Sequence, residues 1–225
     1  MNLAAWNDLE EKILNCRRCE RLVAWREQVA TGKRRAFRDQ VYWGKPVVGF
    51  GDHQAQILIV GLAPGAHGAN RTGRMFTGDS SGDFLYRALY KAGFANQPVA
   101  SYRNDGLELR NVYIGAVCRC APPANKPTSG EIRNCVPYLH REIALLPHLR
   151  VVVALGRIAF EQIVLYFGFT PKPAFRHGVS YRVSNHNINL IASYHPSRQN
   201  TQTGRLTEQM FDQIWIKAKS FLEGV

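Results

Sequence analysis

The sequence of 225 residues lacks several common signatures, and each absence excludes a class of protein. Neither the Gly-Lys-Ser/Thr ending of a phosphate-binding P-loop nor the Gly-x-Gly-x-x-Gly pattern of dinucleotide folds occurs, so nucleotide cofactors are not indicated. No apolar run reaches about 18 residues, and the acidic first turns contain no apolar segment of the kind found in signal peptides. We therefore expect no membrane span, no secretion signal and a cytoplasmic location.

Acidic residues are also scarce. The chain has 29 Lys and Arg residues against 17 Asp and Glu residues, which gives a formal net charge of +12. Such a charge attracts polyanions and makes their binding depend on salt. The arginines gather in residues 17–38, in residues 71–74 and in residues 198–205. Nucleic acid is the partner that this distribution favours, which places the protein at the nucleoid.

The remaining pattern is that of one globular domain over residues 1–225, without repeats or low-complexity segments. A basic loop is expected over residues 31–56, and a Thr128-x-x-Glu131 capping box supports the start of one helix. Helices and strands alternate after this loop, which predicts an α/β fold around a mostly parallel sheet. The periodicity predicts helices at 4–15, 20–30, 82–92, 129–145, 157–167 and 206–222, and strands at 57–61, 112–117, 151–155 and 188–192.

The loop over residues 61–79 follows an apolar strand and is the most informative segment. Its glycines and proline let the backbone approach a ligand, and ligands of open α/β sheets bind outside the carboxyl ends of the strands. Arg71 and Arg74 suit phosphate-type anions, Phe76 suits a flat ring, and Asp79 suits a proton or a water molecule. Because the loops of a parallel sheet gather at one edge, residues far apart in sequence can share this pocket.

The chain contains five cysteines, Cys16, Cys19, Cys118, Cys120 and Cys135. A Cys-x-x-Cys pair with two distant thiols fits a four-thiolate site, which both zinc and iron–sulfur clusters accept, better than a disulfide framework. The alternative is that these thiols bind nothing and that Cys118 and Cys120 are ordinary strand residues. Cys120 precedes a rigid Pro122-Pro123 turn that can aim its thiolate, so we predict Cys120 as the ligand and Cys118 as a core residue.

Three segments together resemble the uracil-DNA glycosylase superfamily, and in particular its iron–sulfur-containing family 5, found in thermophilic bacteria and archaea. They are residues 61–68 with the tail 76–79, residues 120–127, and residues 193–204. The resemblance implies a three-layer αβα fold with a four-stranded parallel sheet, and removal of deaminated or mismatched bases from double-stranded DNA. Separately, we expect the protein to be a monomer. It also implies a [4Fe–4S] cluster bound by Cys16, Cys19, Cys120 and Cys135.

Two positions depart from the sibling family 4. Leu62 stands where that family has an acidic residue that orients water, and Ala116 stands where it has an asparagine that reads uracil. Both departures are typical of family 5. They imply a roomier pocket that accepts uracil, hypoxanthine, xanthine and mismatched thymine.

The residues suit hydrolysis of an N-glycosidic bond after base flipping. Phe76 is expected to stack on the base, and His195, helped by backbone N–H groups of residues 61–65, to stabilise the departing base anion. Asp79 either orients water or caps the helix that starts near residue 82, and Asn125 is either a base contact or a turn residue. The predicted base-binding residues are Gly61, Leu62, Ala63, Pro64, Gly65, Phe76, Ala116 and Asn125.

The expected DNA contacts are Arg71, Arg74, Arg198, Gln199 and Asn200, of which the last three either fill the gap left by the flipped nucleotide or form a solvated loop. The sequence thus predicts a monofunctional uracil-DNA glycosylase. A non-catalytic, zinc-containing nucleic-acid-binding protein and an enzyme with strict uracil specificity are the alternatives.

Overall fold

Four apolar runs form the centre of the fold because each buries both of its faces. The computed structural model, which describes residues 2–184 and 186–224, places them as strands β2 (Ile57–Gly61), β3 (Val112–Ala116), β4 (Val151–Leu155) and β6 (Asn189–Ser193). Every residue of the four strands is buried, as in parallel sheets covered on both sides. The strands run parallel in the order β3-β2-β4-β6, so their carboxyl ends share one edge.

Two short antiparallel strands extend this centre, so the sheet has six strands instead of the expected four. Strand β1 (Phe50–Gly51) pairs with β3, and β5 (Ser180–Arg182) pairs with β6. Neither strand contains a buried residue, and β1 has only two residues. Segments this short and this exposed carry no apolar alternation, which is why the sequence did not indicate them.

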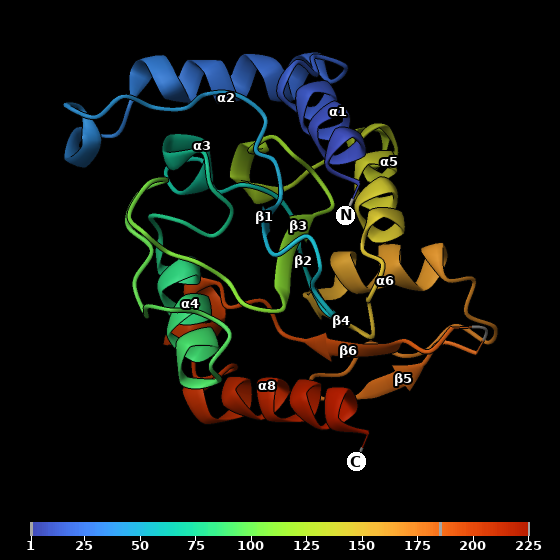
Figure 1. The fold of residues 1–225 in the computed structure, drawn as a ribbon. Coiled ribbons are helices and arrows are strands. Elements are labelled where there is room, and N and C mark those ends of the chain that lie inside the picture. The colour runs from blue at the N-terminus through green and yellow to red at the C-terminus, as the bar shows by residue number, and fades with distance from the viewer. Residues whose placement is uncertain (1, 185, 225) are drawn as a thin grey trace.

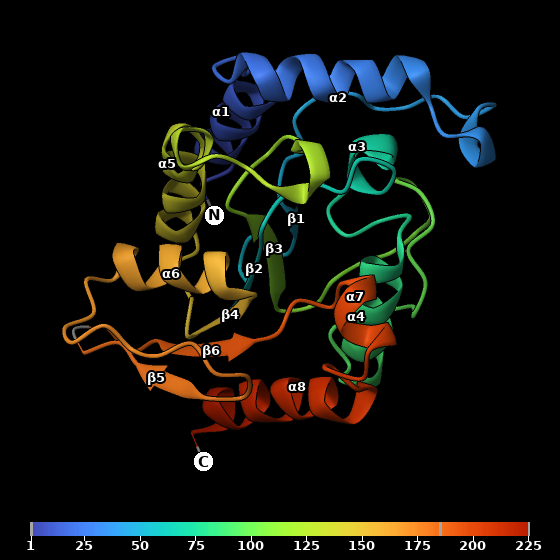
Figure 2. The same ribbon diagram turned by 180° about the vertical axis from the view of Figure 1, so that it is seen from behind.

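Helices cover both faces of the sheet, which confirms the three-layer αβα arrangement (Figures 1 and 2). One face, with Ile57 and Ile59, packs against α4 (Ser80–Lys91) and α8 (Glu208–Glu223). The other, with Leu58 and Val60, packs against α1 (Leu3–Leu14), α5 (Ser129–Leu145) and α6 (Arg157–Tyr166). The capping box of Thr128 and Glu131 is present at the start of α5. In the described part of the chain, no helix has the length and apolarity to cross a bilayer.

The loops contain short helices that the sequence did not predict. Helix α3 (Ala69–Thr72) follows β2, the 3-10 helix η2 (Pro123–Asn125) follows β3, and α7 (Arg198–Gln202) follows β6. The 3-10 helix η1 (Arg35–Phe37) follows α2 (Glu20–Gly32) in the expected basic loop. Since η2, α3 and α7 follow parallel strands, they lie at the carboxyl edge of the sheet, where a ligand site is expected.

Candidate active site

Phe76 and His195 meet at the carboxyl edge of the sheet. Their rings lie with centroids 5.8 Å apart and planes inclined by 27°. A Cβ atom at Gly61 would lie 2.8 Å from the Phe76 ring, so only glycine lets the ring rest on the end of β2. Phe76 itself has a φ of 51°, a left-handed conformation that is rare for a bulky residue and that marks functional sites when the surroundings enforce it. The sequence prediction that these two residues share a site agrees with this geometry.

His195 is partly buried and is held in place by its neighbours. Burial lowers the pKa of His195 to about 4, so its imidazole is neutral at pH 7. The Asn200 side chain donates a hydrogen bond of 2.8 Å from Nδ2 to the His195 carbonyl oxygen. Ser197 caps α7 by accepting from the Asn200 N–H group. Asn200 therefore positions the loop that carries His195, whereas Arg198 and Gln199 are exposed on the same helix.

A cavity of about 220 Å³ opens on one side of His195. Arg157 lies over the ring of Phe175 at 5.3 Å, and Arg205 lies over the ring of Tyr194 at 4.7 Å. The two guanidinium groups, each lying over an aromatic ring, suit an anionic group of a ligand that also contains a flat ring. None of these four residues was predicted as a site residue, although Arg157 comes two positions after the expected strand 151–155 and Arg205 ends the arginine-rich stretch 198–205. The cavity is lined by Gly156, Arg157, Phe175, Tyr194, His195, Asn200 and Arg205.

Asp79 joins the site loop to α4. Its Oδ1 accepts hydrogen bonds from the N–H groups of Ser81, at 3.0 Å, and Gly82, at 3.1 Å, so the residue is the N-cap of α4. Its Oδ2 faces the turn at residues 65–68, where a Cβ at Gly68 would lie 1.9 Å from it. Burial raises the pKa of Asp79. Two roles were expected for Asp79, orienting water or capping a helix, and the hydrogen bonds of Oδ1 are those of a helix cap.

The other predicted base-binding residues fall into two groups. The loop 61–65 continues from β2, where the carbonyl oxygens of Gly61 and Leu62 accept from the N–H groups of Val117, at 3.0 Å, and Cys118, at 2.8 Å. Ala116 is buried opposite Gly61 in the sheet. Asn125 instead lies exposed in η2 with a φ of 56°, which is the turn role considered from the sequence.

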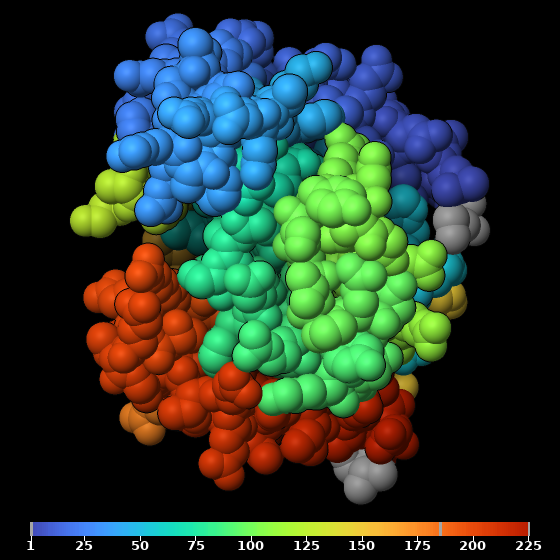
Figure 3. Space-filling view, turned by 90° about the vertical axis from the view of Figure 1, so that its left-hand side faces the viewer, coloured from blue at the N-terminus to red at the C-terminus, as the bar shows by residue number. Residues whose placement is uncertain are grey.

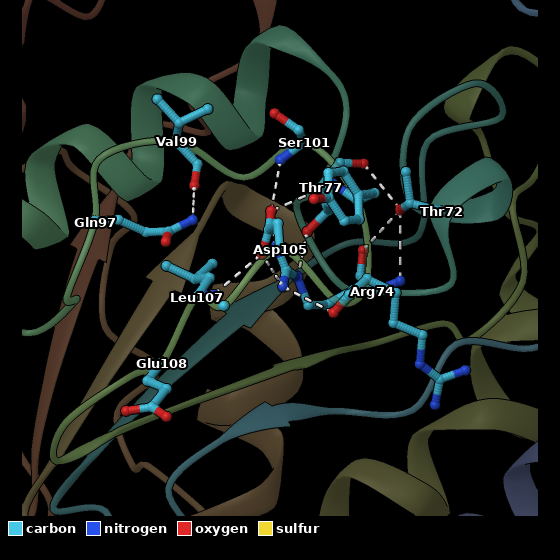
Figure 4. Close-up of polar contacts among 12 residues, drawn as sticks. Thr72, Arg74, Thr77, Gln97, Val99, Ser101, Asp105, Leu107 and Glu108 are labelled. Atoms are coloured by element: carbon cyan, nitrogen blue, oxygen red, sulfur yellow. Dashed lines mark hydrogen bonds and ion pairs between the residues drawn. The ribbon is translucent and has the colours of Figure 1, made fainter.

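Arg71 and Arg74 are buried and hold the site loop together. Arg74 is 4% exposed and forms two hydrogen bonds with Asp105, of 2.7 and 2.8 Å, and one of 2.9 Å with Thr77 (Figure 4). Arg71 donates to the carbonyl oxygens of His67 and Gly78, both at 2.8 Å. We therefore correct the expectation of DNA contact, because both guanidinium groups are engaged inside the protein.

Four of the five cysteines share a small cavity. Cys16, Cys19, Cys120 and Cys135 all line it, whereas Cys118 is packed in the core on the α5 side of the sheet. Among the described residues, no group of three or more His, Cys, Asp or Glu side chains is placed to hold a metal ion. The cavity nevertheless brings together the four thiols that the resemblance implies as ligands of one cluster.

N–H groups point at three of these sulfur atoms. The Cys135 sulfur accepts from the Arg119 backbone at 3.1 Å, and the Cys120 sulfur from Arg26 Nη1 at 3.0 Å. The Cys19 sulfur accepts from Asn134 Nδ2 at 3.5 Å. Donors of this kind favour the thiolate form that binds metal. Burial outweighs them at Cys19 and Cys120 and raises the pKa of both thiols, whereas the pKa of Cys135 is lowered to about 7.

The fold and the site define an α/β protein in which a phenylalanine ring lies against a neutral histidine at the carboxyl edge of the sheet. The model of the uracil DNA glycosylase superfamily matches residues 48–219. The chain is 55% identical over 205 residues to the type-5 uracil-DNA glycosylase of Thermus thermophilus, covering 91% of this chain and 92% of that protein. It is 44% identical over 214 residues to the type-5 enzyme of Pyrobaculum aerophilum, covering 95% and 92%.

A type-4 uracil-DNA glycosylase of Pyrobaculum aerophilum is more distant, at 32% identity over 160 residues, 69% of this chain and 74% of that protein. The chain belongs to the uracil DNA glycosylase superfamily.

Proposed function

We propose that this protein is a monofunctional DNA glycosylase that hydrolyses the N-glycosidic bond of uracil and leaves an abasic site. The observation that carries the proposal is the meeting of Phe76 and His195 above Gly61. The names of the type-5 relatives support it. The enzyme acts as a monomer on double-stranded DNA at the nucleoid.

The chemistry requires a base that has left the duplex, because the bond lies out of reach in the stacked helix. Phe76 stacks on the flipped ring. Bond cleavage leaves negative charge on the base, and the neutral His195 imidazole donates an N–H hydrogen bond to the base oxygen, as donors do in an oxyanion hole. Donation from neutral imidazole needs no proton from solvent, so this role persists at neutral pH.

Water and the sugar cation are handled by the same loop. We assign to the Asp79 carboxylate the role of stabilising the positive sugar or orienting water. Its Oδ2 would do so, because Oδ1 already accepts the hydrogen bonds that cap α4. Arg157, Arg205 and the exposed Arg198 and Gln199 of α7 then contact the backbone around the flipped nucleotide.

The residues at the ends of β2 and β3 support a broad substrate range. Leu62 and Ala116 bring no carboxylate or amide to the end of β2 and β3, so no side chain at these positions reads the uracil edge. We therefore include hypoxanthine, xanthine and mismatched thymine among the substrates.

We also propose that a [4Fe–4S] cluster is held at the cysteine cavity by Cys16, Cys19, Cys120 and Cys135, which all line it. Three buried atoms around it, Arg119 Nε and Nη1 and Arg26 Nε, have no hydrogen-bond partner within the described protein. Arg119 lines the cavity and Arg26 donates to Cys120, so their N–H groups match the negative charge of a four-thiolate cluster. When bound, such a cluster would tie together the segments that carry Cys16, Cys19, Cys120 and Cys135.

The test is single-turnover release of the base from duplexes that contain one G·U, G·T or hypoxanthine pair, read by alkaline cleavage at the abasic site. Release from all three supports the broad enzyme, and release from the G·U duplex alone contradicts the wide pocket. Binding without any release contradicts the glycosylase. Iron and sulfide analysis of anaerobically purified protein tests the cluster, and stoichiometric zinc without iron would refute it.

A further inference from the structure

A basic arm, defined as residues 33–42, extends from the end of α2 and lies outside the three motifs of the site. Arg34, Arg35 and Arg38 are exposed on it. In the space-filling view the arm forms the light-blue upper part of the face, and the segment of α7 forms the orange-red lower part, with a recess between them (Figure 3). The arm therefore shares a face of the molecule with the helix that follows His195.

The arm is attached to the active-site loop. The Tyr42 hydroxyl and His67 Nδ1 lie 3.0 Å apart. The Arg71 guanidinium donates to Gln40 Oε1 at 2.6 Å and lies 4.0 Å over the ring of Phe37. Together with the Arg34 N–H group, which donates to the Tyr42 hydroxyl at 3.4 Å, these contacts hold the backbone of the arm against the protein, so that binding has to order only the exposed arginine side chains.

The same guanidinium reaches the catalytic side of the loop. Arg71 donates at 2.8 Å to the carbonyl oxygen of Gly78, the residue before Asp79. Immediately after the arm, the N–H groups of Trp43 and Gly44 donate to the carbonyl oxygens of Arg71, at 2.9 Å, and Asn70, at 3.0 Å. The arm and the residues that follow it are thus hydrogen-bonded to α3 and to the loop that holds Phe76.

The charges of the arm are not neutralised by the protein. Within the described residues, no carboxylate lies within 4.0 Å of Arg34 or Arg35, and Arg38 approaches only Asp39, at 3.8 Å. Three cations of the preceding segment, residues 12–21, do have carboxylate partners. These pairs are Lys12–Asp8, Arg17–Glu27 and Arg21–Glu131.

We propose that the basic arm binds the phosphate backbone of duplex DNA beside the flipped nucleotide, with Arg34, Arg35 and Arg38 as phosphate contacts. The proposal rests on the proposed function for the presence of DNA at the site. Contacts of this type carry no sequence information; they supply affinity and register, while the pocket at His195 selects the base.

The test is the salt dependence of binding by the variant R34Q/R35Q/R38Q. Fluorescence anisotropy gives Kd for an undamaged duplex and for one with an uncleavable abasic-site analogue. Loss of three phosphate contacts should lower the slope of log affinity against log salt by about 2 to 3. The variant R34K/R35K/R38K should keep the wild-type slope, because a phosphate contact needs the charge alone.

A matched control removes the same charge elsewhere. R110Q/R182Q/K219Q alters Arg110 before β3, Arg182 on β5 and Lys219 on α8, and should leave the slope within about one of the wild type. The proposal would be overturned if R34Q/R35Q/R38Q and R110Q/R182Q/K219Q lowered the salt slope equally. It would also be overturned if R34Q/R35Q/R38Q left the slope unchanged. Binding is measured without turnover, so it is independent of catalysis. If the arm triple lowers the salt slope but the wild-type protein releases no base, the proposed function is refuted and the proposal for the arm is retained.

Discussion

At the scale of single residues, His195 carries the chemistry as a neutral donor. Replacing it with alanine removes the hydrogen bond to the departing base and should lower the single-turnover rate by about 10² to 10³-fold. Kd for an abasic-analogue duplex should change little. His148→Ala, on an exposed histidine, is the control and should keep the wild-type rate. An unaltered rate in His195→Ala would remove His195 from the mechanism.

The same histidine makes stability depend on pH. Burial holds the pKa of His195 at about 4 in the folded protein, against an ordinary value of 6.5, so acid protonates the unfolded chain first. The contribution of neutral His195 is complete above pH 6.5 and is lost as the pH falls toward 4. The difference is worth about 3 kcal/mol.

Urea unfolding at pH 7 and pH 4 measures this effect. Between pH 7 and pH 4, the free energy of unfolding should fall in both proteins, and the fall should be about 3 kcal/mol smaller in His195→Asn than in the wild-type protein. His148→Asn should follow the wild type. Equal acid sensitivity in His195→Asn would mean that the imidazole is protonated in the folded state.

At the scale of elements, a buried ion pair connects the site loop to residues 101–107. Hydrogen bonds from Arg74 and from the N–H groups of Leu107 and Ser101 outweigh burial and lower the pKa of Asp105 to about 2. The stabilisation is present above pH 3.8 and is lost as the pH falls toward 2. The loop that carries Phe76 is therefore braced from a segment outside the motifs (Figure 4).

Asp105→Asn should lower the free energy of unfolding by about 3 to 5 kcal/mol, because it leaves the Arg74 cation buried without its charge partner. Urea denaturation at pH 7 measures the loss. The matched change Asp39→Asn, on a side chain that is 93% exposed, should cost almost nothing. A loss of less than about 1 kcal/mol at Asp105 would contradict the bracing role.

The sequence predicted the elements whose pattern is local. Continuous apolar runs such as that ending at Val60 specify buried strands, and Thr128 with Glu131 specifies a helix start. The burial of Arg74 was not predictable in this way, because it depends on Asp105, which the chain folds next to it from a separate loop. Asn200 is a similar case, since a polar residue in a polar loop gives no sign that it holds the His195 backbone.

At the scale of the whole molecule, the cysteine cavity joins the N-terminal helices to the sheet. Cys16 and Cys19 lie between α1 and α2, Cys120 follows β3, and Cys135 lies on α5. A cluster in this place would hold α2, and with it the basic arm that follows, against the rest of the protein. Iron binding and DNA affinity should therefore be linked.

Cys120→Ala should lose the iron and the visible thiolate-to-iron absorbance, whereas Cys118→Ala should retain both. Both residues are buried, so the pair separates ligand loss from a simple core defect. Hydrogen exchange should rise over residues 16–32 in Cys120→Ala. Retained iron in Cys120→Ala with loss in Cys118→Ala would reverse the ligand assignment.

The two edges of the sheet have a consequence for how the protein behaves when crowded. Exposed strand edges are templates on which another chain can add its own strand, and aggregation begins there. Here the outermost strands have two and three residues, and both run against the direction of their neighbours. The four fully buried strands thus lie between β1 and β5, which are too short to pair with a strand of a second copy. The topology itself protects a highly apolar sheet from fibrous self-association.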